Sequence, residues 1–257
     1  MKRGIQSPVR VRNLEFGGEK PLFCVPIVPR DPTELVAQGE VAHKLRPELI
    51  EWRADFFLTP TVSSLVEAAR LIRNTAPTEP IIFTLRAKNE GGAQEIPQPD
   101  RRVLIEALLR SSLIDIVDLE LSNDDDFLQH LMQVARQCGI PVILAFHDFQ
   151  RTLENDVLLS KIESMRSHGA SIAKIAVMPQ TPEDVLRLLQ VTACARRLHP
   201  NLPLITMSMG ALGSVTRVAG FLFGSDMSFA LGQSGSAPGQ IPMEDARKIT
   251  EMLLRYS

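Results

Sequence analysis

The run Pro141-Val-Ile-Leu-Ala-Phe-His147 and the run Ser171-Ile-Ala-Lys-Ile-Ala-Val177 set the architecture of this chain. Both are almost wholly apolar, as expected of strands that are buried on both faces. The segment between them, 153–168, spaces its apolar residues as an amphipathic helix does. Two strands joined by such a segment are predicted to pair in parallel, because a parallel crossover needs about a dozen residues or more.

The same strand-and-helix unit recurs along the chain. Further apolar runs lie at 22–28, 49–53, 81–86, 114–120, 203–208 and 221–225, and amphipathic segments at 63–73, 100–109, 124–137 and 181–198. Eight units predict an α/β fold, a closed (β/α)8 TIM barrel. An open, doubly wound sheet is the alternative, but GxGxxG does not follow the first run and GxxxxGK[ST] is absent. Residues 1–16 alternate weakly and are expected to form an N-terminal β-hairpin that closes the barrel floor.

Composition limits the kind of protein and partner. The chain has 257 residues, of which 44% are hydrophobic and 23% charged, and we expect a single domain, 1–257. A net charge of −2 and 5% aromatic residues argue against nucleic acid or an anionic membrane and favour a small polar metabolite. Three scattered cysteines, no apolar leader and no apolar stretch of about 20 residues predict a soluble, cytoplasmic protein. No metal-ligand spacing is present.

Lys174 interrupts a buried run, where an unpaired charge is costly. It is either a lysine paired with an acid or an amine nucleophile that forms a Schiff base with a ketone. The ordinary pKa of lysine is near 10.4, and burial beside other cations would lower it and free the amine.

His147 ends the neighbouring run, so it and Lys174 can face one cavity at the carboxyl end of the barrel. A histidine there can act as general acid or base, although a satisfied core histidine is the commoner case. Glu90 could orient this histidine, or it could be an exposed loop acid.

Paired charges end other runs. Glu51 and Arg53 are two residues apart and therefore share one face of a strand, where they could bind the hydroxyl groups of a polyol or form a structural salt bridge. Asp118 and Glu120 have the same spacing, and there we favour structural pairing. Arg86 closes the third run.

Two loops complete the candidate site. The loop 208–214 resembles a phosphate cradle before a helix, and Arg217 beyond it could clamp a carboxylate. The segment 232–240 is rich in small residues and could be a lid.

Six ordered motifs make the chain similar to type I 3-dehydroquinate dehydratase of the shikimate pathway. They are Glu51-Trp-Arg53-Ala-Asp55, Thr84-Leu-Arg86-Ala-Lys-Asn-Glu90-Gly-Gly, Phe146-His147-Asp-Phe, Ala173-Lys174-Ile-Ala-Val-Met-Pro, Met207-Ser-Met-Gly-Ala-Leu-Gly-Ser-Val-Thr-Arg217 and Ser236-Ala-Pro-Gly-Gln240-Ile.

The resemblance implies a lyase of chorismate and aromatic amino acid biosynthesis, homodimeric and without metal or organic cofactor. It implies that Lys174 forms an imine with the ketone, that His147 moves protons and that Glu90 positions His147. It assigns the substrate carboxylate to Arg217, Ser236 and Gln240, and the ring hydroxyls to Glu51, Arg53 and Arg86.

Two other functions stay open from the residues alone. A Schiff-base aldolase would use Lys174 and bind a sugar phosphate at 208–214. A non-catalytic barrel would keep its buried charges for stability and bind a protein partner at its surface.

Overall fold

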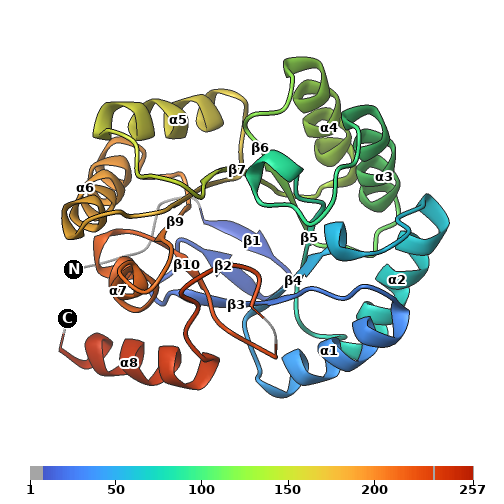
Figure 1. Cartoon of the computed structure of the whole chain (residues 1–257), viewed down its shortest axis with the longest axis horizontal. Coiled ribbons are helices and arrows are strands. Elements are labelled where there is room, and N and C mark those ends of the chain that lie inside the picture. The colour runs from blue at the N-terminus through green and yellow to red at the C-terminus, as the bar shows by residue number, and fades with distance from the viewer. Residues whose placement is uncertain (1–7, 234, 257) are drawn as a thin grey trace.

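The computed structural model describes residues 8–233 and 235–256, and its centre is a parallel eight-stranded barrel with helices outside it (Figure 1). This confirms the predicted (β/α)8 fold. The barrel strands are β3 (Leu22–Ile27), β4 (Leu49–Arg53), β5 (Ile81–Thr84), β6 (Ile116–Glu120), β7 (Val142–Asp148), β8 (Ile172–Val177), β9 (Leu204–Ser208) and β10 (Met227–Phe229). The helices are α1 (Pro32–Lys44), α2 (Val62–Thr75), α3 (Gln98–Arg110), α4 (Asp125–Cys138), α5 (Asn155–Ser167), α6 (Pro182–Leu198), α7 (Ser214–Ala219) and α8 (Met243–Arg255).

Short 3₁₀ helices follow β4 and β5, namely η1 (Ala54–Phe56) and η2 (Lys88–Glu90), and a third, η3 (Gly220–Phe223), continues from α7. The longest helix, α6, begins after Thr181, which forms a capping box with Asp184. Among residues 8–233 and 235–256, we find no helix with the length and apolar character needed to cross a membrane.

Side chains alternate along each strand between the barrel interior and the helix layer. In β8, Ile172 and Ala176 belong to the interior cluster, whereas Ala173 and Ile175 pack against the helices. The interior residues near the strand starts are apolar, and the charged interior residues lie in the middle or at the ends of their strands. Period-two alternation thus points Lys174 into the barrel.

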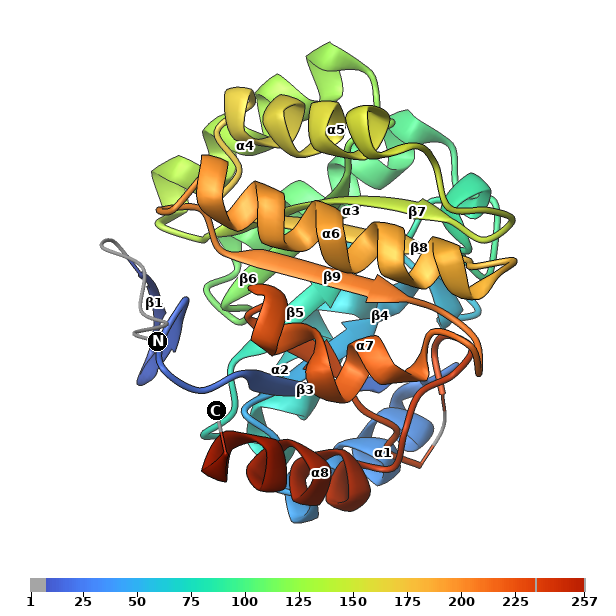
Figure 2. The ribbon, with the colours of Figure 1, turned by 90° about the vertical axis from the view of Figure 1, so that its left-hand side faces the viewer.

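The N-terminal hairpin closes the barrel floor, as predicted. Strands β1 (Val9–Val11) and β2 (Leu14–Phe16) pair antiparallel, and Figure 2 shows them at the end where β3 and β9 begin. Val11 and Phe16 are buried in the same cluster as the interior residues of the barrel. The hairpin therefore covers apolar surface that would otherwise face water.

The eighth strand lies later than the sequence predicted. Residues 220–223 form η3, with Leu222 43% and Phe223 39% exposed, and the strand follows at Met227–Phe229. Apolar character alone misplaced it, because a short apolar run does not distinguish a strand from a helical turn. Ser225, the last residue of the expected strand, and Asp226 after it instead close the seam to β9: the Ser225 hydroxyl accepts the Thr206 N–H at 3.0 Å, and the Asp226 N–H donates to the Leu204 carbonyl at 2.7 Å.

A repeated contact joins alternate strand pairs at the floor. The residue just before β4, β6 or β10 is an acid whose carboxylate accepts an N–H at the start of the preceding partner strand and pairs with a helix arginine. The acids are Glu48, Asp115 and Asp226, with Arg247, Arg73 and Arg196. Before β8 the position holds Ser171, whose hydroxyl accepts the Val142 N–H at 3.2 Å. These contacts fix the register of the strands at the floor of the barrel.

Asp115 contacts two arginines and a strand N–H, so replacing it tests whether the floor acids stabilise the barrel. It accepts the Ile81 N–H at 2.8 Å, pairs with Arg73 at 2.5 Å and holds Arg12 of the hairpin at 2.6 Å. We expect Asp115→Ala to lower the free energy of unfolding by about 2–4 kcal/mol, because it leaves two arginines without their acid and the Ile81 N–H without its acceptor.

Urea unfolding, with an unchanged slope, is the measurement. The matched control is Asp125→Ala, since that side chain is 85% exposed, and it should change stability by less than about 0.5 kcal/mol. Equal effects of the two substitutions would contradict this role of the floor acids.

Candidate active site

The residues singled out in the sequence surround one cavity at the carboxyl ends of the barrel strands. The cavity has a volume of about 30 Å³. The side chains that line it include Glu51, Arg53, Arg86, Glu90, His147, Lys174, Arg217, Ser236 and Gln240. The structure thus brings together every residue that the sequence proposed for the site.

Lys174 lies at the base of this cavity and is only 4% exposed. Its Nζ donates to Asp118 Oδ2 at 2.8 Å, lies 3.7 Å from Glu51 Oε1 and stands 4.5 Å from the centre of the Phe229 ring. The sequence predicts other cations beside this amine. The groups in direct contact with Nζ are carboxylates instead, contributed by the strands β4 and β6.

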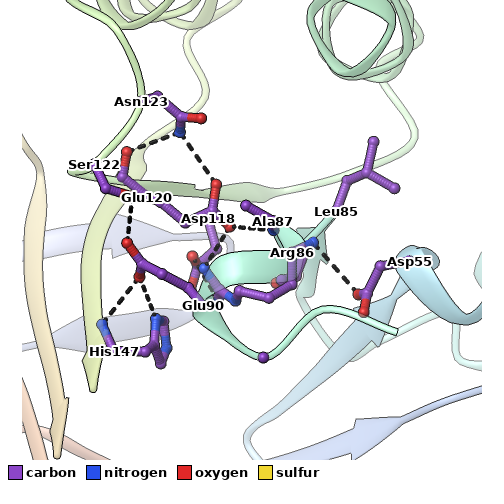
Figure 3. A network of polar contacts seen from close by, with 12 residues as sticks. Asp55, Leu85, Arg86, Ala87, Glu90, Asp118, Glu120, Ser122, Asn123 and His147 are labelled. Carbon is purple, nitrogen blue, oxygen red and sulfur yellow. Dashed lines mark hydrogen bonds and ion pairs between the residues drawn. The ribbon is translucent and has the colours of Figure 1, made fainter. Parts of the chain in front are cut away.

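Asp118 and Glu120 both point into the barrel, and both pair with Arg86, but each has a different second cation (Figure 3). Arg86 bridges them, with Nη2 at 2.8 Å from Asp118 and Nη1 at 2.8 Å from Glu120. The other oxygen of Glu120 pairs with Arg101. Burial would raise the pKa of Glu120, but the two arginines hold it at about 2. The predicted structural pairing describes Glu120, whereas Asp118 also reaches the amine.

His147 is the last residue but one of β7, and Glu90 holds it from η2 (Figure 3). Glu90 Oε2 accepts both the His147 backbone N–H and the Nδ1 hydrogen bond, each at 2.9 Å. The Ser122 hydroxyl donates to the other carboxylate oxygen. Gly92 allows the tight loop that follows, because a Cβ there would lie 2.2 Å from the Arg86 carbonyl oxygen. Glu90 is buried, not an exposed loop acid.

The environment shifts both members of this pair toward their neutral forms. Burial raises the pKa of Glu90 to about 7, despite the hydrogen bond from Ser122. Burial, together with the positive charges of Arg86 and Lys174, lowers the pKa of His147 well below its usual value. The imidazole is therefore uncharged near neutral pH and can accept a proton.

Asp55 fixes the loop that carries Glu90. Its carboxylate binds Arg53 through two contacts of 2.8 Å and accepts the Ala93 N–H at 2.9 Å. Arg53 Nη2 also donates to the Gly91 carbonyl at 3.1 Å. The end of β4 and the loop after β5 are thereby held together around the cavity.

Arg217 meets the small-residue segment at the mouth. Its guanidinium donates to the carbonyls of Phe229 at 3.2 Å and Pro238 at 2.9 Å, and its buried Nε has no hydrogen-bond partner. Burial lowers the pKa of Arg217 to about 10. Gln240 accepts the Ser236 N–H at 2.9 Å, which turns the segment over the cavity.

The loop 208–214 is packed rather than open. A Cβ on Gly213 would lie 2.3 Å from the Ser208 carbonyl oxygen, and the Thr216 hydroxyl accepts the Ser208 N–H at 3.0 Å. Gly213 therefore serves close backbone contact, and the predicted likeness to a phosphate cradle does not survive in the structure.

Three residues around the site went unrecognised in the sequence: Asp118 as a partner of Lys174, Ser122 and Asp55. The only signal for Asp118 was its inward phase with Glu120 on one strand. Ser122 and Asp55 carried none, because a hydroxyl or carboxylate just after a strand is common in any barrel.

Comparisons with known proteins identify the family. The model of the type I 3-dehydroquinase family matches residues 23–257. The 3-dehydroquinate dehydratase of Geobacillus kaustophilus is 43% identical over 252 residues, which are 97% of each chain, and that of Aromatoleum aromaticum is 44% identical over 245 residues, 94% of each chain.

Solved structures are equally similar. The crystal structure of the G. kaustophilus enzyme superposes with a TM-score of 0.94 over 98% of each chain. The type I enzyme of Clostridium difficile, solved with covalent modified comenic acid, gives a TM-score of 0.93 at 31% identity, covering 97% of this chain and 98% of that one. From the family match and these near full-length relatives we conclude that this chain belongs to the type I 3-dehydroquinase family, the enzymes that dehydrate 3-dehydroquinate in the shikimate pathway.

Proposed function

We propose that this enzyme converts 3-dehydroquinate to 3-dehydroshikimate through a Schiff base on Lys174, with His147 as general acid and base. The observation that carries the proposal is that a buried amine and a neutral imidazole on the neighbouring strands β7 and β8 line one cavity. Such an amine can capture a ketone, and such an imidazole can take the proton beside it. The comenic acid covalently modified in the C. difficile structure supports covalent chemistry by analogy.

Each step follows from the chemistry of the intermediate. Lys174 attacks C3 and water leaves, which gives a protonated imine. The positive nitrogen makes the C2 proton acidic, because the electron pair released there flows into the imine. His147 takes this proton to form an enamine and then donates it to the departing C1 hydroxyl on the same face. Hydrolysis of the product imine frees Lys174.

Substrate contacts follow from the position of each charge. Arg217, Ser236 and Gln240 surround the mouth and would hold the carboxylate, with the free Nε of Arg217 as one donor. Glu51 and Arg53 line the same cavity from β4, and Arg86 lines it from the end of β5; these three would bind the ring hydroxyls. We propose that segment 232–240 opens for entry and closes again over the imine, because Ser236 and Gln240 of this segment line the cavity.

The setting of the enzyme is part of the proposal. We propose that it works as a cytoplasmic homodimer, in which residues 1–257 of each subunit form a single domain. We also propose that its reaction uses no metal or organic cofactor, since amine and imidazole supply the whole of the chemistry above.

Borohydride reduction tests the imine. Reduction in the presence of 3-dehydroquinate should attach the ligand to Lys174 alone, because only the iminium at that Nζ is trapped as a stable amine. Peptide mass mapping locates the label. Lys174→Met should abolish it, and Lys161→Met, which removes a lysine outside the cavity, should leave it in place. A label on any other residue would refute the assignment.

The role of the imidazole is tested with His147→Ala. This variant should still form the trapped imine, but turnover should fall about 10²–10⁴-fold, the usual size of a lost general acid–base catalyst. Steady-state rates and mass analysis of the trapped species separate the two steps. His43→Ala removes a histidine bonded to Glu79 away from the cavity and serves as control. Normal turnover by the His147 variant would exclude its role.

The raised pKa of Glu90 predicts the pH dependence. Glu90 is protonated below its pKa of about 7. The protonated acid has lost the negative charge with which it accepts the two hydrogen bonds from His147. We therefore expect kcat/KM to rise as pH increases through about 7. Glu90→Gln should lower kcat and remove this rise. The same inflection in the Glu90→Gln variant would assign it to another group.

A further inference from the structure

Asp118 occupies an unusual position, because its two oxygens contact two different cations. Oδ1 lies 2.8 Å from Arg86 Nη2, and Oδ2 accepts from Lys174 Nζ at 2.8 Å. All three side chains are at most 4% exposed. Arg86 is fixed in turn by Glu120, so the carboxylate of Asp118 is held in place from its far side. The mechanism above gives this residue no task.

The charge at Nζ explains why a fixed anion matters. In forming the imine, Nζ gains a bond to C3, the C3–oxygen bond breaks, and two of the three ammonium protons leave on that oxygen as water. Nζ keeps one proton and one positive charge, so the resting ammonium and the iminium carry the same charge at the same atom. A carboxylate placed for the first is therefore already placed for the second, without reorganisation.

We propose that Asp118 is a further catalytic residue of this enzyme, and that its carboxylate keeps the Lys174 imine protonated while His147 removes the C2 proton. The inference rests on the proposed Schiff-base function. A neutral imine is a poor electron sink, because electrons that enter it leave a negative charge on nitrogen. Losing the proton at Nζ would therefore stop the reaction at the imine.

The neighbouring acids are less suited to this task. Glu51 is 3.7 Å from Nζ, and the same oxygen already accepts the Thr84 hydroxyl at 3.0 Å. Glu120 points into the barrel from the same strand, but its oxygens are taken by Arg86 and Arg101. Asp118 alone among these three acids makes a direct hydrogen bond to the amine.

The test is Asp118→Asn, with Glu120→Gln as the matched control. Each variant removes one acid partner of Arg86, but only the first removes the anion from Nζ. We expect Asp118→Asn to lower kcat about 10²–10³-fold, the usual loss when preorganised charge is removed. The kcat of the parent divided by the kcat of the variant should fall toward one as pH falls, by up to about tenfold per pH unit, because solution protons then restore the iminium.

The other ionisable groups around the cavity cancel in this ratio, since parent and variant share them. They are Glu51, Arg53, Arg86, Glu90, His147 and Arg217, with Cys24 beside Glu51 and Lys174. The Glu120→Gln variant should therefore show a ratio that does not change with pH, whatever its stability. Asp118→Glu keeps the negative charge, so its kcat ratio should be as independent of pH as that of Glu120→Gln. This variant is the test of the inference if Asp118→Asn does not fold.

Borohydride trapping separates failure of this inference from failure of the proposed function. If the parent enzyme gives no label at Lys174, the Schiff-base function itself is wrong. If the parent is labelled and Asp118→Asn keeps the parent kcat, or loses activity with a pH-independent ratio, Asp118 has no catalytic role. A pH-dependent ratio for Asp118→Glu would equally overturn it. Slower labelling of Asp118→Asn that recovers at low pH supports the inference.

Discussion

The ion pair of Lys174 with Asp118 is the constraint on which the site depends. A cation inside a barrel is tolerated only with an anion close by, because removing an unpaired charge from water costs several kcal/mol or more. The strand phase that points Lys174 inward also points Glu51 and Asp118 inward from β4 and β6. The interior thus passes from an apolar floor to a charged mouth within a few residues of each strand.

The remaining charges extend from this pair as alternating acids and arginines. Arg86 joins Asp118 to Glu120, and Arg101 from α3 completes the series. Glu90 stands apart, because it is held by hydroxyl and N–H donors, and no ion pair to an arginine or lysine is found for it among the described residues. Its charge is consequently easy to lose, which suits a residue that tunes a histidine rather than one that holds strands together.

The floor of the barrel solves a different problem with similar groups. Its acids satisfy backbone N–H groups at the starts of strands and bind helix arginines, so they fix register where water could compete for the ladder. The hairpin then seals the apolar interior. The floor is thus closed, whereas at the mouth Arg217 binds the Pro238 carbonyl of the segment that we propose to open.

The sequence by itself determined the barrel and the set of cavity residues, because periodicity, apolar runs and inward phase are local properties of the chain. It misplaced the eighth strand, since the apolar residues 221–223 lie in a 3₁₀ helix and the strand begins only at Met227. Which charges meet was decided only by the tertiary structure. Asp118 and Lys174 are separated by 56 positions, and their contact depends on barrel closure, stagger and side-chain length, none of which is encoded in either strand alone.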